Sequence, residues 1–120
     1  MKRIEKIEDL RVWKKAHEFT IFTYKITANF PDNEKYGLIS QMRRCAVSIP
    51  SNIAEAFRRR GKDKFVFYSY ADASLEELRY QFLLSYELEY INKDEYNSAK
   101  QLADEIGGML NRWVKSLKNP

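Results

Sequence analysis

Apolar residues recur every three or four positions through most of this 120-residue chain. Between positions 38 and 57 one stripe keeps this spacing without a break: Leu38, Met42, Cys45, Ile49, Ile53 and Phe57. This period places side chains on one face of an α-helix, whereas a half-buried strand would show strict alternation. No alternating stretch is long enough to require a strand. The pattern therefore predicts an all-α protein.

Few residues interrupt these stripes, since the chain has only three prolines and four glycines. Four long helices are predicted between the interruptions, over about residues 10–28, 34–60, 64–90 and 93–117. Short connections between helices of similar length favour antiparallel neighbours. The predicted fold class is an up-and-down antiparallel four-helix bundle. Residues 1–120 should form a single domain, because no linker or repeat divides them.

The ends of the predicted helices carry capping signals. Asp9, Asp32 or Asn33, and Asp63 can cap the first three helices. Asn92 and Glu95 have the spacing of a capping box before the fourth. In the predicted first helix two neighbouring stripes form one wide apolar face, with Leu10, Trp13, His17, Thr20 and Tyr24 in one and Val12, Ala16, Phe19 and Ile26 in the other.

Pro50 lies in the middle of the predicted second helix. A proline there removes one helical hydrogen bond and crowds the carbonyl four residues before it. We therefore expect the helix to be kinked at Pro50, with Ser48, Ser51 or Asn52 offering partners to the freed backbone groups. Gly61 is a suitable residue to follow the end of this helix.

Residues that could perform catalysis are scarce. His17, the only histidine, lies in an apolar stripe, and Cys45, the only cysteine, lies between Met42 and Ile49 in another. Both are interpreted as structural. No cofactor and no metal site are predicted, because a bundle di-metal site needs two Glu-x-x-His motifs. A single cysteine permits no internal disulfide, and no apolar run is long enough for a signal peptide or a membrane span, so we expect a cytoplasmic protein.

A run of basic residues is the strongest functional signal. Residues 58–64 hold five cations and one acid, Asp63, and Arg43 and Arg44 precede them on the same predicted helix. Residues 1–64 carry 15 Lys/Arg and 8 Asp/Glu, whereas residues 65–120 carry 6 and 9. The cations can bind nucleic acid, remain solvated at a helix end, or pair with a neighbouring subunit. The predicted nucleic-acid-binding residues are Arg43, Arg44, Arg58, Arg59, Arg60, Lys62 and Lys64.

The predicted third helix has apolar residues on two opposite sides. Tyr68, Ala71, Leu75, Leu78, Phe82 and Tyr86 form the side expected to face the core. Two apolar faces on one helix indicate neighbours on both sides, so this helix predicts self-association. The predicted oligomer interface consists of Tyr70, Ala73, Glu77, Leu84 and Leu88.

Several longer motifs resemble those of a known family. They are the segments 9–16 (DLRVWKKA), 30–31 (FP), 36–38 (YGL), 41–56 (QMRRCAVSIPSNIAEA) and 71–78 (ADASLEEL). The set closely resembles the bacterial four-helix-bundle proteins encoded by intervening sequences of 23S ribosomal RNA genes. It is also similar to the accessory variability proteins of diversity-generating retroelements. The chain departs from the family pattern at Cys45, where alanine is expected, and at Ala56, where glycine is common.

The resemblance implies a four-helix bundle that assembles into a ring, typically a pentamer, without enzymatic activity. The retroelement relatives imply a basic surface that binds nucleic acid, and a reverse transcriptase partner. From the residues and the resemblance together, the predicted function is that of a non-enzymatic oligomer that binds RNA or DNA. The alternative is a structural or protein-interaction ring, or an adaptor, with no nucleic-acid role.

Overall fold

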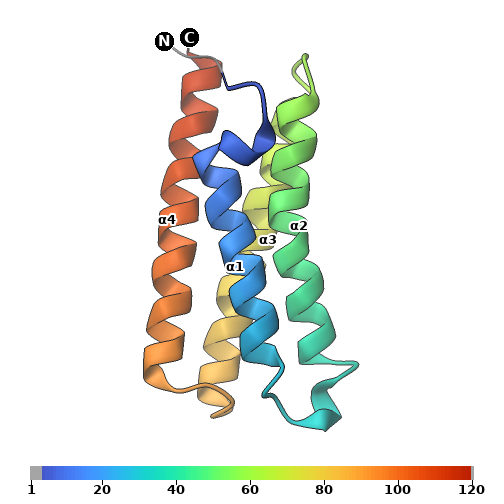
Figure 1. Ribbon diagram of the computed structural model, residues 1–120, viewed down its shortest axis with the longest axis vertical. Helices are drawn as coiled ribbons and strands as arrows, with labels where there is room; N and C mark the ends of the chain where they lie inside the picture. The colour runs from blue at the N-terminus through green and yellow to red at the C-terminus, as the bar shows by residue number, and fades with distance from the viewer. Residues whose placement is uncertain (1–3, 120) are drawn as a thin grey trace.

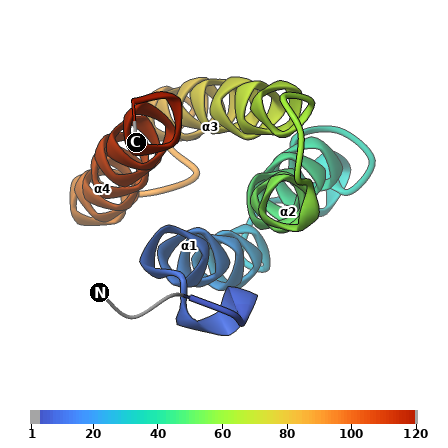
Figure 2. The same ribbon diagram turned by 90° about the horizontal axis from the view of Figure 1, so that it is seen from above.

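The protein is an all-α bundle in the computed structural model, which describes residues 4–119. No strand occurs within that range, and the helices alternate in direction along the long axis (Figure 1). Seen from above, α1 and α3 lie at opposite corners, and α2 and α4 separate them (Figure 2). The predicted up-and-down four-helix bundle is confirmed. The elements are η1 (Ile7–Asp9), α1 (Arg11–Thr27), η2 (Asp32–Glu34), α2 (Leu38–Arg58), α3 (Lys64–Glu87) and α4 (Lys93–Lys118).

The start of α4 follows the sequence signal, because Asn92 and Glu95 form the predicted capping box. The Asn92 Oδ1 accepts a hydrogen bond from the Glu95 N–H at 2.8 Å, and the Glu95 Oε1 accepts one from the Asn92 N–H at 2.9 Å. These two bonds satisfy backbone N–H groups that have no partner within the first turn of a helix.

None of the other predicted caps makes a capping hydrogen bond, although Asp63 occupies the N-cap position of α3. Asp9 lies in η1, and Leu10 directly precedes α1 without a side-chain cap. Asp32 and Asn33 lie in η2, so α2 begins at Leu38, four residues later than predicted. A tertiary contact accompanies this delay, since the Tyr90 hydroxyl donates to Glu34 at 2.8 Å. Asp63 directly precedes α3, but its side chain makes no capping hydrogen bond.

Helices α2 and α3 end earlier than predicted. Arg59 has an extended backbone, with φ −79° and ψ 143°, so α2 ends before Gly61. After α3, Glu89 adopts a left-handed φ of 65°, which a residue with a side chain rarely does. The Tyr90 N–H then donates to the Ser85 carbonyl at 2.9 Å. This hydrogen bond belongs to a helix-ending motif in which the left-handed residue, here Glu89, is usually glycine.

The core contains most of the predicted stripes. The rings of Phe19 on α1 and Phe82 on α3 stack across its centre with their centroids 5.5 Å apart. On α1 the prediction was too broad, because His17 and Tyr24 are exposed. A bundle helix packs against two neighbours, so only part of its circumference is buried. The largest fully buried apolar side chains are Phe19, Met42, Ile49, Ile53, Leu75, Leu78, Phe82 and Ile106.

Helix α2 continues without interruption through Pro50, so the kink at this residue remains a prediction. The carbonyl that Pro50 leaves without its usual donor is that of Ala46. The hydroxyl of Thr20 on α1 lies 2.9 Å from this carbonyl oxygen and 3.0 Å from the Ala16 carbonyl oxygen of its own helix, so its one proton is shared between the two acceptors. The predicted partners were on α2 itself, and of these Asn52 donates to the Ser48 carbonyl at 2.8 Å. The substitute for the missing bond therefore comes from a neighbouring helix.

The adjacent glycines of α4 have different surroundings. A Cβ on Gly107 would lie 3.3 Å from the Arg79 guanidinium and 3.6 Å from Leu75, both on α3. Arg79 is held in place, because it donates to the Ala103 carbonyl at 3.1 Å and to Asp104 at 2.6 Å. Gly107 thus permits a close approach of α3 and α4. A Cβ on Gly108 would meet only the side chain of Arg112, which is exposed and can move.

Replacing Gly108 by alanine is therefore expected to stabilise the protein by roughly 0.5–1 kcal/mol, the difference in helix propensity between the two residues. Urea denaturation measures this change. Gly107→Ala is the matched control on the same helix, and its free energy of unfolding should rise by less, because Arg79 must be displaced. Equal gains at both positions would mean that Gly107 is not needed for helix contact.

Candidate nucleic-acid interface

One end of the bundle collects positive charge. Because the helices alternate in direction, the C-termini of α2 and α4 and the N-terminus of α3 lie at the same end (Figure 1). The connection between α2 and α3 contributes five of the predicted cations to this end, and all but the half-buried Lys64 are exposed. We call this region the basic end. Its described cations are Lys6, Arg11, Arg58, Arg59, Arg60, Lys62, Lys64, Arg112, Lys115 and Lys118.

The contribution of α4 was missed by the sequence analysis. Arg112, Lys115 and Lys118 are exposed and lie within the last two turns of α4. They are about 50 positions from the run at 58–64, so no local pattern connects them. The predicted antiparallel order of the helices would have revealed them, since it places the ends of α2 and α4 together.

The opposite end is rich in acids, among them Asp32, Glu87, Glu89, Asp94 and Glu95. The sequence showed a polarity between the two halves of the chain. In the structure the polarity runs along the long axis instead, because each half contributes helix ends to both ends of the bundle. The basic end is not free of acids, since Glu5, Glu8, Asp9, Glu55 and Asp63 also lie there.

Two of these acids are engaged by Arg59. Its guanidinium lies 3.1 Å from Asp63 and 3.6 Å from Glu55, and it covers the Phe67 ring at 4.6 Å from the centroid. Exposed ion pairs of this kind contribute little to stability. They nevertheless neutralise Arg59 in part. Arg58, Arg60 and Lys62 form no ion pair with any residue in the described range 4–119, which leaves their charges available to an anion.

Arg43 and Arg44 do not join the basic end. They lie near the start of α2, about 22 Å along the helix from Arg58 at 1.5 Å per residue. Arg43 is half-buried against α1, where its Nε donates to the Thr27 hydroxyl at 2.9 Å. Its guanidinium also covers the Tyr24 ring at 4.7 Å. Arg44 is exposed and donates only to Ser40 within the described residues.

The two neighbouring arginines should therefore respond differently to substitution. Arg43→Ala is expected to lower the free energy of unfolding by about 1 kcal/mol, because it removes the hydrogen bond to the buried Thr27 hydroxyl. Arg44→Ala is the matched control and should change it by less than about 0.5 kcal/mol. Urea denaturation of both variants measures the difference. An equal, negligible effect would show that the contacts of Arg43 do not stabilise the bundle.

A second surface of interest lies on α3, opposite the core. Tyr70, Ala73, Glu77 and Leu88 are exposed as the predicted interface requires, whereas Leu84 is half-buried against the core. Val66 and Tyr80 were not among the predicted interface residues, although Tyr80 is 62% exposed. We call the exposed set the outer face of α3; its members are Val66, Tyr70, Ala73, Glu77, Tyr80 and Leu88.

His17 and Cys45 do not form a nucleophile–base pair. His17 is exposed and stacks on Trp13, with ring centroids 5.2 Å apart. Cys45 faces α3, where its thiol donates to the Ser74 carbonyl at 3.0 Å. Burial, followed by the nearby Glu77 carboxylate, raises the pKa of Cys45 to about 12. The thiol therefore stays protonated at neutral pH, whereas nucleophilic catalysis requires the thiolate.

Residues 4–119 contain no group of three or more His, Cys, Asp or Glu side chains arranged to hold a metal ion. None of the helices described is both long enough and apolar enough to cross a membrane.

Comparison with known proteins identifies the family. The family model of the 23S rRNA-intervening sequence protein matches residues 8–112. The chain belongs to this family. The match to the 23S rRNA-intervening sequence protein family spans the motifs noted in the sequence and the run of cations at 58–64. None of the curated proteins compared with the chain matches it.

A solved structure of a related protein has the same fold. It is a protein of unknown function from the S23 ribosomal protein family of Bacteroides thetaiotaomicron VPI-5482. The two chains are 27% identical with a TM-score of 0.76, and the alignment covers 87% of this chain and 98% of the other. Neither comparison indicates an enzyme family or a catalytic relative.

Proposed function

We propose that this protein is a non-enzymatic, oligomeric nucleic-acid-binding protein whose basic end contacts phosphate groups. The observation that supports the proposal most is the gathering of exposed cations from separate segments at one end of the bundle. Cations at the C-termini of α2 and α4 also complement the helix dipoles, but one or two residues suffice for that. The remaining charges suit a polyanion, whose phosphates accept contacts from Arg and Lys without regard to sequence.

RNA is the first nucleic acid to test, because the family name refers to 23S rRNA. A filter-binding titration at several salt concentrations provides the test. Each phosphate that a cation neutralises adds about 0.7–0.9 to the slope of log affinity against log salt, so five such contacts predict a slope of about −4. Absence of binding even at low salt would refute the proposal.

Self-association is the second part of the proposal, and the outer face of α3 supports it. Four of its large apolar side chains are 45–62% exposed: Val66, Tyr70, Tyr80 and Leu88. Scattered exposed apolar residues are normal, whereas a row of them along one helix marks an interaction surface. The same observation favours the alternative function, a protein-interaction ring or adaptor that does not bind nucleic acid.

Light scattering tests self-association. The wild-type protein should have several times the mass of one 14.3 kDa chain, and replacing Tyr70 and Tyr80 by glutamate should shift it toward the monomer. Tyr36→Glu is the matched control, because Tyr36 is 89% exposed but lies between α1 and α2. A monomeric wild-type protein would exclude the oligomer. An oligomer that binds no RNA or DNA would favour the alternative function.

A further inference from the structure

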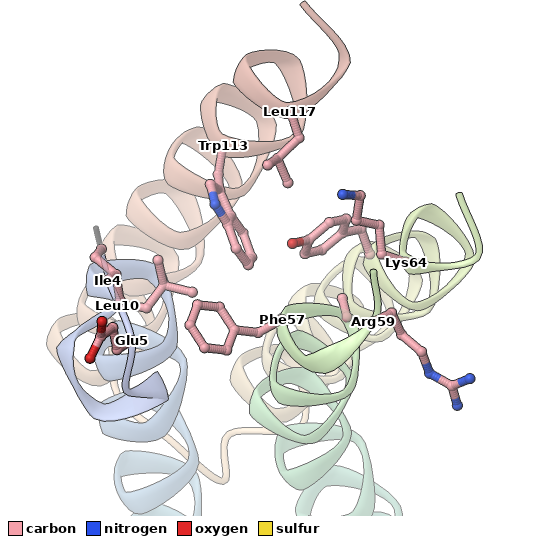
Figure 3. Close-up of a pocket in the computed structure, with 10 residues that line it drawn as sticks. Ile4, Glu5, Leu10, Phe57, Arg59, Lys64, Trp113 and Leu117 are labelled. Atoms are coloured by element: carbon pink, nitrogen blue, oxygen red, sulfur yellow. The ribbon is translucent and has the colours of Figure 1, made fainter. Parts of the chain in front are cut away.

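A pocket of about 580 Å³ opens at the basic end. Its volume is within the roughly 300–1,000 Å³ typical of small-molecule sites. All four helices or their flanking residues contribute to it (Figure 3). The lining residues that matter for its chemistry are Leu10 before α1, Phe57 on α2, Lys64 and Tyr68 on α3, and Trp113 and Leu117 on α4.

Three aromatic rings form the walls of this pocket. Trp113 packs near both of the others, with its ring centroid 4.5 Å from that of Tyr68 and 6.5 Å from that of Phe57. Tyr68 is only 3% exposed, and its hydroxyl makes no hydrogen bond to any residue from 4 to 119. Burial raises the pKa of this hydroxyl, so it remains a hydrogen-bond donor. The pocket therefore offers ring surface of the half-buried Phe57 and Trp113, and the Tyr68 hydroxyl as one donor without a protein partner.

The charged groups at the rim are arranged unequally. Lys64 lies at the opening (Figure 3). Arg60 and Lys62 precede it in the connection between α2 and α3 and are exposed. The guanidinium of Arg59 points away from the pocket, toward Asp63 and Glu55. Glu5 stands on the other side of the opening. An anionic ligand would therefore approach from the side of Lys64.

We propose that this pocket receives one unstacked base of a single-stranded or looped nucleic acid whose phosphates lie on the basic end. This inference rests on the function proposed above and adds the form of nucleic acid recognised. Aromatic side chains stack on bases that are free of a duplex, and neighbouring cations track the backbone. An apolar side chain of a partner protein could fill the pocket, but it would make no ion pair with Lys64 at the opening. The experiments below distinguish a partner side chain from a base.

The fluorescence of Trp113 reports directly on the pocket. A Trp13→Phe protein retains Trp113 as its only tryptophan. The probes are a thymidine oligonucleotide of about 12 nucleotides, within the usual site sizes for single strands, and a blunt DNA duplex with the same number of phosphates. At saturation, the single strand should quench Trp113 and the duplex should not. Equal effects of the two probes would overturn the inference.

Filling the pocket should weaken single-strand binding selectively. Leu117→Trp places an indole at the pocket wall without changing charge, and it should weaken single-strand binding by roughly 5- to 100-fold, the contribution of one stacked base. Duplex binding should not change. Ile21→Trp is the matched control on the exposed side of α1. Phe57→Leu, which removes one ring wall and keeps an apolar side chain, serves as a second test should Leu117→Trp fail to fold.

The possible failures are distinguishable. If neither probe binds at low salt, the proposed function fails and the pocket inference fails with it. If both probes bind equally and neither pocket variant changes the affinity, the basic end binds phosphates but the pocket receives no base. The same result is expected if the pocket belongs to a protein partner, so it overturns the inference while the proposed function stands.

Discussion

Replacing Arg58, Arg60 and Lys62 by glutamate is expected to lower the affinity for single-stranded RNA by at least about 100-fold at ~0.1 M salt. Removing one phosphate-binding cation lowers the affinity by a factor of roughly eight at that salt concentration, and the new carboxylates add repulsion. The slope of log affinity against log salt should decrease in magnitude by about 2–3. These side chains are exposed and form no ion pair within residues 4–119, so the fold should tolerate the change.

A matched variant reverses three charges at the other end of the bundle. Lys25, Lys35 and Lys93 are exposed there, and replacing them by glutamate changes the net charge by the same amount. This variant should retain most of its affinity, because charges far from the phosphates are screened beyond about 10 Å at 0.1 M salt. Equal reductions in affinity in the two variants would show that binding follows net charge and not the basic end. Thermal unfolding of both proteins checks that they remain folded.

Replacing Thr20 by valine is expected to lower the free energy of unfolding by roughly 1–3 kcal/mol, because the Ala46 carbonyl is then left without a donor beside α1. The Pro50→Ala background should remove most of this cost. Alanine at position 50 has an N–H that can donate to the same carbonyl through an ordinary helical bond. Urea denaturation of the four proteins of this double-mutant cycle measures the coupling between Thr20 and Pro50.

The control for this cycle is Thr23→Val. Thr23 is fully buried, and its hydroxyl donates to the Phe19 carbonyl of its own helix at 2.8 Å. That carbonyl also accepts the normal helical bond, so removing its second donor should cost less than removing the donor to Ala46. If Thr20→Val were equally costly with proline or with alanine at position 50, the hydroxyl would not be the substitute for the bond that Pro50 lacks.

The candidate site was only partly predictable, and the reason lies in helix direction. Residues 58–64 are continuous in sequence, so their charge was visible without a structure. Arg112, Lys115 and Lys118 join them only because α2 and α4 run in the same direction. Arg43 was grouped with the site because of its charge, although the structure places it near the other end of α2 against Thr27. Charge is a property of the residue, but its surroundings depend on the packing.

The sequence by itself determined the number of helices, their antiparallel order and most of the core, because apolar spacing and short connections depend on local geometry. It also determined the Asn92–Glu95 capping box, whose two bonds span only three residues. Only the tertiary structure decided how Pro50 is accommodated, since the donor to the Ala46 carbonyl comes from Thr20, 26 residues away. The same holds for the basic end and its aromatic pocket. Both consist of residues that are remote in the chain and that meet only when the helices pack.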